Sequence, residues 1–127
     1  MSILKAFTNH LMEFITDIHR VFPNDSELRT GKIFLEGLVR INPKNVIVGW
    51  KECVNDVYEE QINKGDLNYF IEKDYNQDLN GSLSKSKILT IIEGFRDKVK
   101  NMNDQNKKKS MKYVQNLVKL CNMYYKN

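Results

Sequence analysis

The residues best suited to binding chemistry are the lysines near the end of the chain. From Gln105 onward there are six lysines and no acidic side chain. At 100° per residue, one narrow arc of a helix over 104–126 carries four of them with two amides: Lys108, Lys112, Gln115, Lys119, Asn122 and Lys126. Lys98 and Lys100, on the preceding helix, would widen this patch. Ammonium groups pair with phosphates as point charges, so the pattern predicts binding to a DNA or RNA backbone with weak sequence selectivity.

Two other interpretations of the lysine face stay open. It is also typical of the solvated outer face of a bundle helix. Alternatively, it pairs with an acidic docking face on the predicted helix 43–64 of a second copy, which gives a homodimer or a virion-structural layer without nucleic acid. The acidic residues of that face are Glu52, Asp56, Glu59 and Glu60.

The stretch 76–87 resembles the calcium loop of an EF-hand in its first half. Asn76, Asp78 and Asn80 occupy alternate positions, and Gly81 stands at the sixth, where the loop turns sharply. The twelfth position needs a glutamate that binds the ion through both oxygens, but Lys87 stands there. Because a lysine cannot ligate a cation and repels it, we expect an Asx-rich turn and no calcium site.

Other groupings of reactive residues give no indication of catalysis. His10 and His19 fall on opposite faces of one predicted helix, and no HExxH or CxxC spacing is present. Carboxylates one turn apart, such as Glu13 and Asp17, are typical of solvated helix faces. No nucleophile elbow and no phosphate-loop spacing occur. We therefore predict a protein that is not an enzyme, with no metal, no cofactor and no small-molecule substrate.

The elements that position these residues are all predicted to be helices, because apolar residues recur at three- and four-residue steps. The expected ranges are 3–22, 27–41, 43–64, 67–73, 85–101 and 104–126. Asn42-Pro43 is a strong helix start and Gly65 a helix stop. Within 43–64 the α-helical period directs Trp50, Val54 and Val57 inward. The predicted fold is all-α, one domain over 1–127 in a single compact bundle of five to six helices.

Length and composition fit this fold. The chain has 127 residues, of which 41% are hydrophobic, so wholesale disorder is not expected. Residues 1–63 contain 7 basic and 9 acidic side chains, whereas 82–127 contain 11 basic and 3 acidic. This asymmetry favours an anionic partner. The beginning of the chain lacks the apolar run of a signal peptide, and no stretch approaches the ~18 apolar residues of a membrane span, so we expect neither secretion nor a membrane protein. Cys53 and Cys121 lie in apolar rows and are expected to be buried free thiols.

The chain contains three long helical runs: FTNHLMEFITDIHRVFPNDSELRTGK, WKECVNDVYEEQINKGDLNYFIEKDY and NMNDQNKKKSMKYVQNLVKL. Together they resemble a group of small helical proteins encoded by nucleocytoplasmic large DNA (giant) viruses, and the resemblance covers most of the chain. It supplies no active-site residues. It implies a protein made in the host cytoplasm that resides in the virus factory, the virion or the nucleus. It favours a nucleic-acid-binding role and a virion-structural role about equally.

Overall fold

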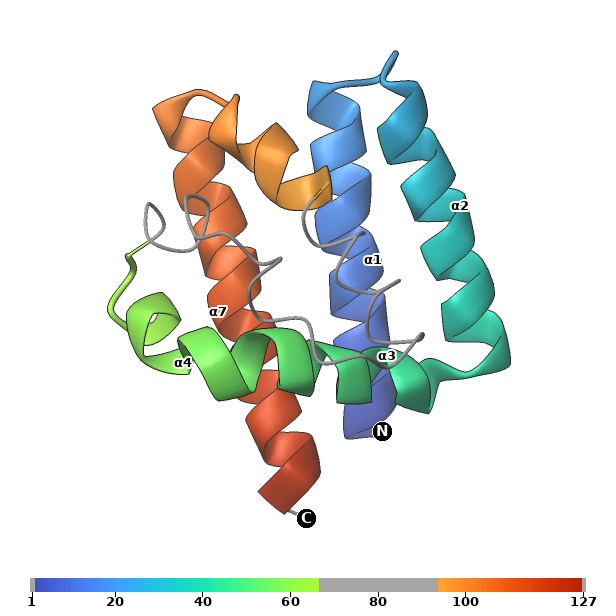
Figure 1. Cartoon of the computed structure of the whole chain (residues 1–127), viewed down its shortest axis with the longest axis vertical. Helices are drawn as coiled ribbons and strands as arrows, with labels where there is room; N and C mark the ends of the chain where they lie inside the picture. Colours follow the sequence, from blue (N-terminus) through green and yellow to red (C-terminus); the bar gives the residue numbers. More distant parts are fainter. Residues whose placement is uncertain (1, 67–93, 127) are drawn as a thin grey trace.

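Every regular element in the described part of the computed structural model, residues 2–66 and 94–126, is a helix. The longest are α1 (Ile3–Val21), α2 (Ser26–Ile41) and α7 (Asp104–Lys126). Figure 1 shows α1 between α2 and α7, with the chain from residue 43 to residue 63 running across α1 and α7. A shorter helical segment, 94–100, precedes α7. The predicted all-α compact bundle is confirmed.

Side-chain caps start four of these helices. Each cap oxygen accepts a hydrogen bond from the backbone N–H three residues later, over 2.8–3.3 Å, which satisfies an amide that has no partner within the helix. The capping residues are Ser2, Asp25, Asn42 and Asn103. Pro43 occupies the first turn after Asn42, as predicted.

The region predicted as one helix over 43–64 contains a wider turn in its middle. It consists of α3 (Pro43–Trp50), a π-helical turn η1 (Lys51–Asn55) and α4 (Asp56–Asn63). The N–H of Asp56 donates to the carbonyl of Lys51, five residues back, where an α-helix would close over four. The π turn therefore inserts one extra residue, and every later side chain is rotated by about 100° from its α-helical position.

This rotation corrects the predicted core. Val57, expected to point inward, is 41% exposed, whereas Tyr58 is completely buried. Ile62, four residues after Tyr58, is also completely buried. Asn55 enters the interior on the same row. The α-helical period fails after Asn55 because the π turn inserts one residue into the helix.

Gly65 ends α4, as predicted. Its N–H donates to the carbonyl of Ile62, and the N–H of Asp66 donates to the carbonyl of Gln61, both over 2.9 Å. This pair of bonds is the Schellman motif. The motif requires a left-handed residue, and Gly65 has φ +77°.

The core lies where α1, the 43–63 run and α7 meet. Phe7 packs edge-on against Trp50, with ring centroids 5.9 Å apart. The completely buried side chains of α1, α3 and η1 meet those of α7 in a single cluster that includes Phe7, Ile15, Ile47, Val54, Leu117, Val118 and Cys121. None of the helices in the described ranges has the length and apolar composition needed to cross a membrane.

Several predictions of the sequence fall outside the described residues. These are the helix 67–73, the Asx-rich stretch 76–87 and the first part of the helix 85–101. The assignment of the whole chain to one domain also stays a prediction.

Exposure along α7 predicts which of its residues stabilise the fold. Leu117 is completely buried, so Leu117→Ala should lower the free energy of unfolding by about 2–5 kcal/mol. Met123 is 50% exposed, and Met123→Ala should change it by less than about 0.5 kcal/mol. Urea denaturation followed by circular dichroism measures both values. Equal losses for the two variants would contradict this packing of α7.

Candidate nucleic-acid interface

The apolar face of α7 packs into the core and its basic face is open to solvent. Residues 111, 114, 117, 118 and 121 are buried, which confirms the predicted orientation of the helix. Tyr125, near the end of α7, is 43% exposed, and Lys51 Nζ lies 5.1 Å from its ring centroid. This contact has the geometry of a cation–π interaction at the end of the helix.

Four predicted binding lysines are exposed and form no ion pair with a described residue. They are Lys108, Lys112, Lys119 and Lys126, which we call the lysine row. Lys109, one residue from the start of the row, differs because its Nζ lies 3.1 Å from Asp17 Oδ2 of α1. At 1.5 Å per residue, the row spans about 27 Å. Lys109 thus links α7 to α1, whereas the four lysines of the row face solvent.

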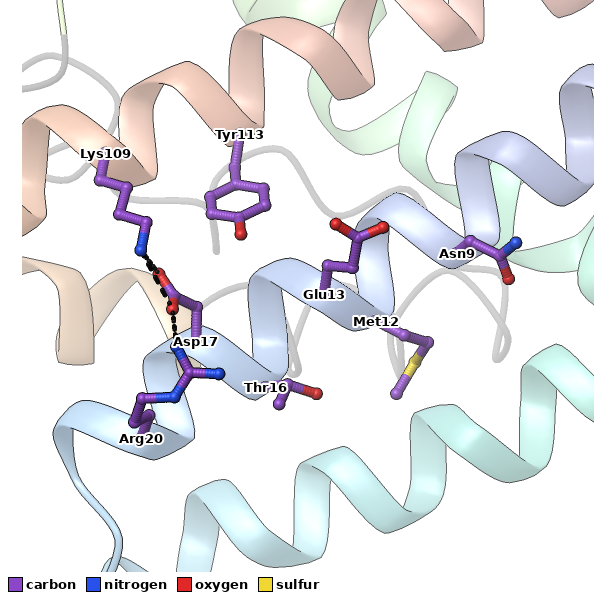
Figure 2. Close-up of a pocket in the computed structure, with 8 residues that line it drawn as sticks. All are labelled: Asn9, Met12, Glu13, Thr16, Asp17, Arg20, Lys109 and Tyr113. Carbon is purple, nitrogen blue, oxygen red and sulfur yellow. Dashed lines mark hydrogen bonds and ion pairs between the residues drawn. The ribbon is translucent and has the colours of Figure 1, made fainter.

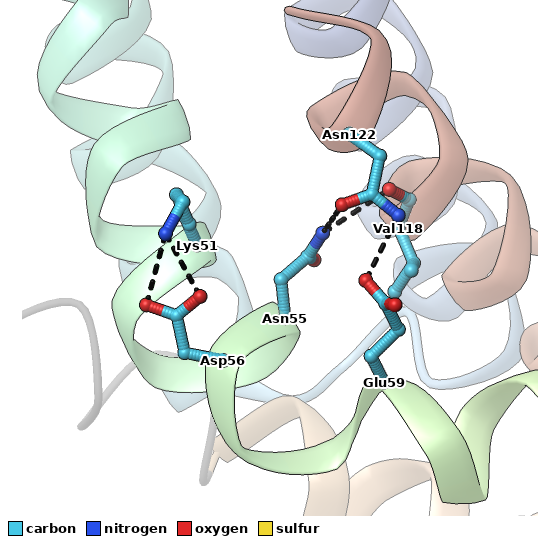
Figure 3. A network of polar contacts seen from close by, with 6 residues as sticks. All are labelled: Lys51, Asn55, Asp56, Glu59, Val118 and Asn122. Carbon is cyan, nitrogen blue, oxygen red and sulfur yellow. Dashed lines mark hydrogen bonds and ion pairs between the residues drawn. The ribbon is translucent and has the colours of Figure 1, made fainter. Parts of the chain in front are cut away.

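The two amides predicted to join the row are engaged inside the protein. Gln115 Nε2 donates to the carbonyl of Ile62 over 2.9 Å, at the end of α4. Asn122 donates through Nδ2 to Glu59 Oε1 over 2.8 Å and accepts at Oδ1 from Asn55 Nδ2 over 3.1 Å (Figure 3). Their role is to attach α7 to the 43–63 run. The prediction that these amides contact nucleic acid is replaced by this structural role.

Asn55 is the centre of the polar contacts between the π turn and α7. It is only 5% exposed, and its Nδ2 donates both to Asn122 Oδ1 and, over 3.2 Å, to the carbonyl of Val118 (Figure 3). Sequence analysis missed this residue because its partners are 63 and 67 positions away. One sign was available: Asn55, Tyr58 and Ile62 share a helical row of their own, displaced by one residue from the predicted row.

The predicted acidic docking face is largely paired within the chain. Asp56 accepts from Lys51 Nζ over 2.9 and 3.1 Å, and Glu60 accepts from Lys64 Nζ over 3.0 Å. Glu59 accepts from Asn122. Glu52 forms neither an ion pair nor a side-chain hydrogen bond with a described residue. The four acids therefore do not form one continuous unpaired surface.

Lys98 also has an internal partner and does not extend the lysine row. Its Nζ lies 2.6 Å from Asp25 Oδ2 and 3.9 Å from Glu27 Oε2, at the start of α2. The hydrogen bond from Lys98 lowers the pKa of Asp25, and the same bond raises the pKa of Lys98. Both shifts favour the charged pair. Lys100, the other predicted extension, is exposed on the 94–100 segment.

A shallow cleft of about 580 Å³ lies between α1 and α7 (Figure 2). Asp17 stands on its wall between two cations, with Arg20 Nη1 at 2.9 Å and Lys109 Nζ at 3.1 Å. Asp17 was interpreted as part of a solvated face, whereas the structure shows a bridge between α1 and α7. The charges of Asp17, Arg20 and Lys109 on the wall of the cleft are therefore engaged with one another.

The histidines and cysteines, all of which lie in the described part of the chain, are less exposed than the lysine row. His10 contacts Tyr113, with ring centroids 5.0 Å apart, and both cysteines are buried free thiols, as predicted. Across residues 2–66 and 94–126, no three His, Cys, Asp or Glu side chains are placed to hold a metal ion.

Comparisons with known proteins do not identify a relative. No protein-family model matches the chain, and neither a curated protein nor a solved structure matches it. The resemblance to giant-virus proteins stays a prediction, and the functional argument depends on the surfaces described above.

The shared hydrogen bond of Asn55 and Asn122 predicts energetic coupling between them. Asn55→Ala and Asn122→Ala should each lower the free energy of unfolding by about 1–3 kcal/mol, because each leaves a part-buried polar group without its partner. The double variant should lose less than the sum of the single losses, by roughly 0.5 kcal/mol or more. Urea denaturation of all three variants measures the coupling, with Lys119→Ala as the control on the exposed face. Strict additivity would show that the two amides act independently.

Burial also predicts how one cysteine responds to pH. Burial raises the pKa of the Cys121 thiol from 9.0 to about 12. The folded state therefore favours the protonated thiol, and this contribution to stability is complete below pH 9.0 and decreases as the pH rises towards about 12. In a Cys53→Ala background, Cys121 should resist alkylation until the protein is unfolded. Replacing Cys121 by Ala as well should remove part of the stability loss seen at alkaline pH. Rapid alkylation of the folded protein at neutral pH would contradict the assigned burial.

Proposed function

We propose that this protein binds the sugar–phosphate backbone of DNA or RNA through the lysine row of α7. The observation that carries the proposal is that Lys108, Lys112, Lys119 and Lys126 are exposed on one helix face and unpaired with described residues. Other lysines of the same chain, among them Lys98 and Lys109, are held in ion pairs between elements. The row is thus a set of positive charges that form no ion pair within the described part of the chain.

Binding of this kind is driven by release of counterions from the nucleic acid. If each of the four lysines neutralises one phosphate, log K should fall against log salt concentration with a slope of about −3.6. Lysine lacks the planar fork with which arginine reads guanine. Gln115 and Asn122, the amides nearest the row, are engaged with Ile62 and Glu59. We therefore propose weak sequence selectivity.

The proposed role is that of a non-enzymatic binding protein. It requires only a rigid helix with an open charged face, and α7 is held along its length by the core and by the amides of Gln115 and Asn122. The resemblance to giant-virus proteins supports a place of action in the virus factory, the virion or the nucleus, where a viral genome is copied or packed.

Charge reversal tests the assignment. Changing Lys112, Lys119 and Lys126 together to Glu should remove most of the affinity for a labelled DNA or RNA duplex at low salt. A matched control changes three exposed cations elsewhere, Lys5, Arg29 and Lys44, to Glu, and should retain most of the binding. Fluorescence anisotropy at two salt concentrations gives both affinity and salt slope.

Two results would contradict the proposal. Equal loss in the two triple variants would show that only net charge matters and would remove the assignment to α7. Absence of binding by the unmodified protein to both DNA and RNA at low salt would remove the function itself.

A further inference from the structure

The outer face of α2 carries an apolar row with a gap in its centre. Ile33 is 62% exposed and Ile41 is 84% exposed, although both are large aliphatic side chains. Gly37 lies midway between them, four residues from each, so the three share one stripe of the helix. A Cβ added at Gly37 would meet no atom within 4 Å. The row thus consists of two exposed isoleucines on either side of an open space at Gly37, which we call the notch.

The opposite face of α2 is already occupied. Leu28 and Leu35 are buried, and α2 packs against α1 and α3. Figure 1 shows α2 at the edge of the bundle, separated from α7 by α1. The apolar row therefore belongs to a surface distinct from the lysine row.

Two opposite charges lie beside the notch. Glu36 and Arg40 fall on the same flank of the Ile33–Gly37–Ile41 stripe, at about −100° and −60° from Gly37 at 100° per residue. Both are exposed, and neither forms an ion pair with a described residue, although they stand one turn apart. The flank thus offers one free anion and one free cation close to the centre of the stripe.

We propose that α2 is a homodimer interface, in which two copies pack their α2 helices antiparallel about a two-fold axis at Gly37. In this register Ile33 of one copy faces Ile41 of the other, and the contact occurs twice by symmetry. The absence of a side chain at Gly37 allows the two backbones to approach closely, so that the isoleucines at either end of the notch contact one another.

The charges specify a second copy of this chain as the occupant. An antiparallel two-fold axis brings a flank against the same flank of the other helix. Glu36 then lies about 3 Å along the helix axis from Arg40 of the second copy, and two reciprocal ion pairs form beside the apolar contact. A parallel arrangement would place these charges on opposite flanks and would lose both pairs. The pattern is therefore self-complementary in one orientation.

This interface goes beyond the proposed function and is independent of it. A dimer formed through α2 leaves both copies of α7 exposed, because α1 lies between α2 and α7 (Figure 1). The dimer presents two lysine rows. It differs from the pairing of acidic and basic helix faces considered from the sequence, since neither Glu52 nor the lysine row takes part.

The first test is to fill the notch. Sedimentation velocity of the full chain over a range of concentrations should show a monomer–dimer equilibrium, which Gly37→Leu should shift towards monomer by roughly tenfold or more in Kd. Gly94→Leu is the matched control, because a Cβ at Gly94 also meets no atom within 4 Å. The control should dimerise like the unmodified protein. A strict monomer before mutation, or equal dimerisation of the Gly37 and Gly94 variants, would overturn the proposal.

The second test exchanges the charges. Glu36→Arg and Arg40→Glu should each weaken the dimer because each brings like charges together across the axis, and the double exchange should restore it. A double variant as weak as either single one would rule out the antiparallel register. Anisotropy with labelled DNA on the Gly37→Leu protein keeps the two proposals separate, since loss of the dimer should leave the salt-dependent binding of each α7 intact.

Discussion

The π turn at Lys51–Asn55 is the constraint on which the rest of the structure depends. An α-helix continued from Trp50 would have directed Val57 into the core and placed Tyr58 at the edge of the core-facing side. With one residue inserted, Tyr58 and Ile62 are completely buried and Asn55 reaches the backbone of α7. The Nδ2 of Asn55 donates two hydrogen bonds that offset part of the cost of burying this amide, whereas its Oδ1 is buried without a hydrogen-bond partner among the described residues. The π turn therefore determines which side chains of the 43–63 run contact α7.

That attachment decides which polar groups of α7 stay available. Gln115 and Asn122 lie in the same arc as the lysines, but their amide groups reach the end of α4 and the π turn. A short amide near a neighbouring helix finds a partner there, whereas a lysine side chain of the same arc extends into solvent. Apart from Asp104 in the first turn of α7, the charged side chains left open in this arc are lysines, which are suited to a uniform polyanion and poorly suited to reading bases.

Ion pairs between helices also decide which lysines stay available on the surface. Lys98 is tied to the start of α2, and Lys109 is tied to α1 through Asp17. These partly buried pairs link elements of the bundle and also cancel charge locally. Among residues 2–66 and 94–126, cations without an ion pair remain along the outer side of α7, and one anion and one cation without an ion pair remain beside the notch of α2. Both proposed interfaces use charged side chains that form no ion pair within the described part of the chain.

Local chemistry explains what the sequence by itself determined. Apolar periodicity predicted the all-α class, and caps such as Ser2 and the Asn42-Pro43 start lie within three residues of the amides they satisfy. Gly65 ends its helix because only glycine adopts a positive φ there without strain. The solvent-facing lysines of α7 and its buried apolar side were likewise visible as a helical pattern.

Only the tertiary structure decided the register after Trp50 and the partners of the polar groups. The same sequence can form a regular α-helix or a helix with a π turn. The first directs Val57 into the core and the second directs Tyr58 there, and both side chains are apolar enough to be buried. The choice between them is made by packing against α7, which begins about forty residues further on. The bridge from Asp17 to Lys109 joins residues 92 positions apart. A sequence pattern describes neighbours within a few turns, and these contacts exist only once distant helices have packed.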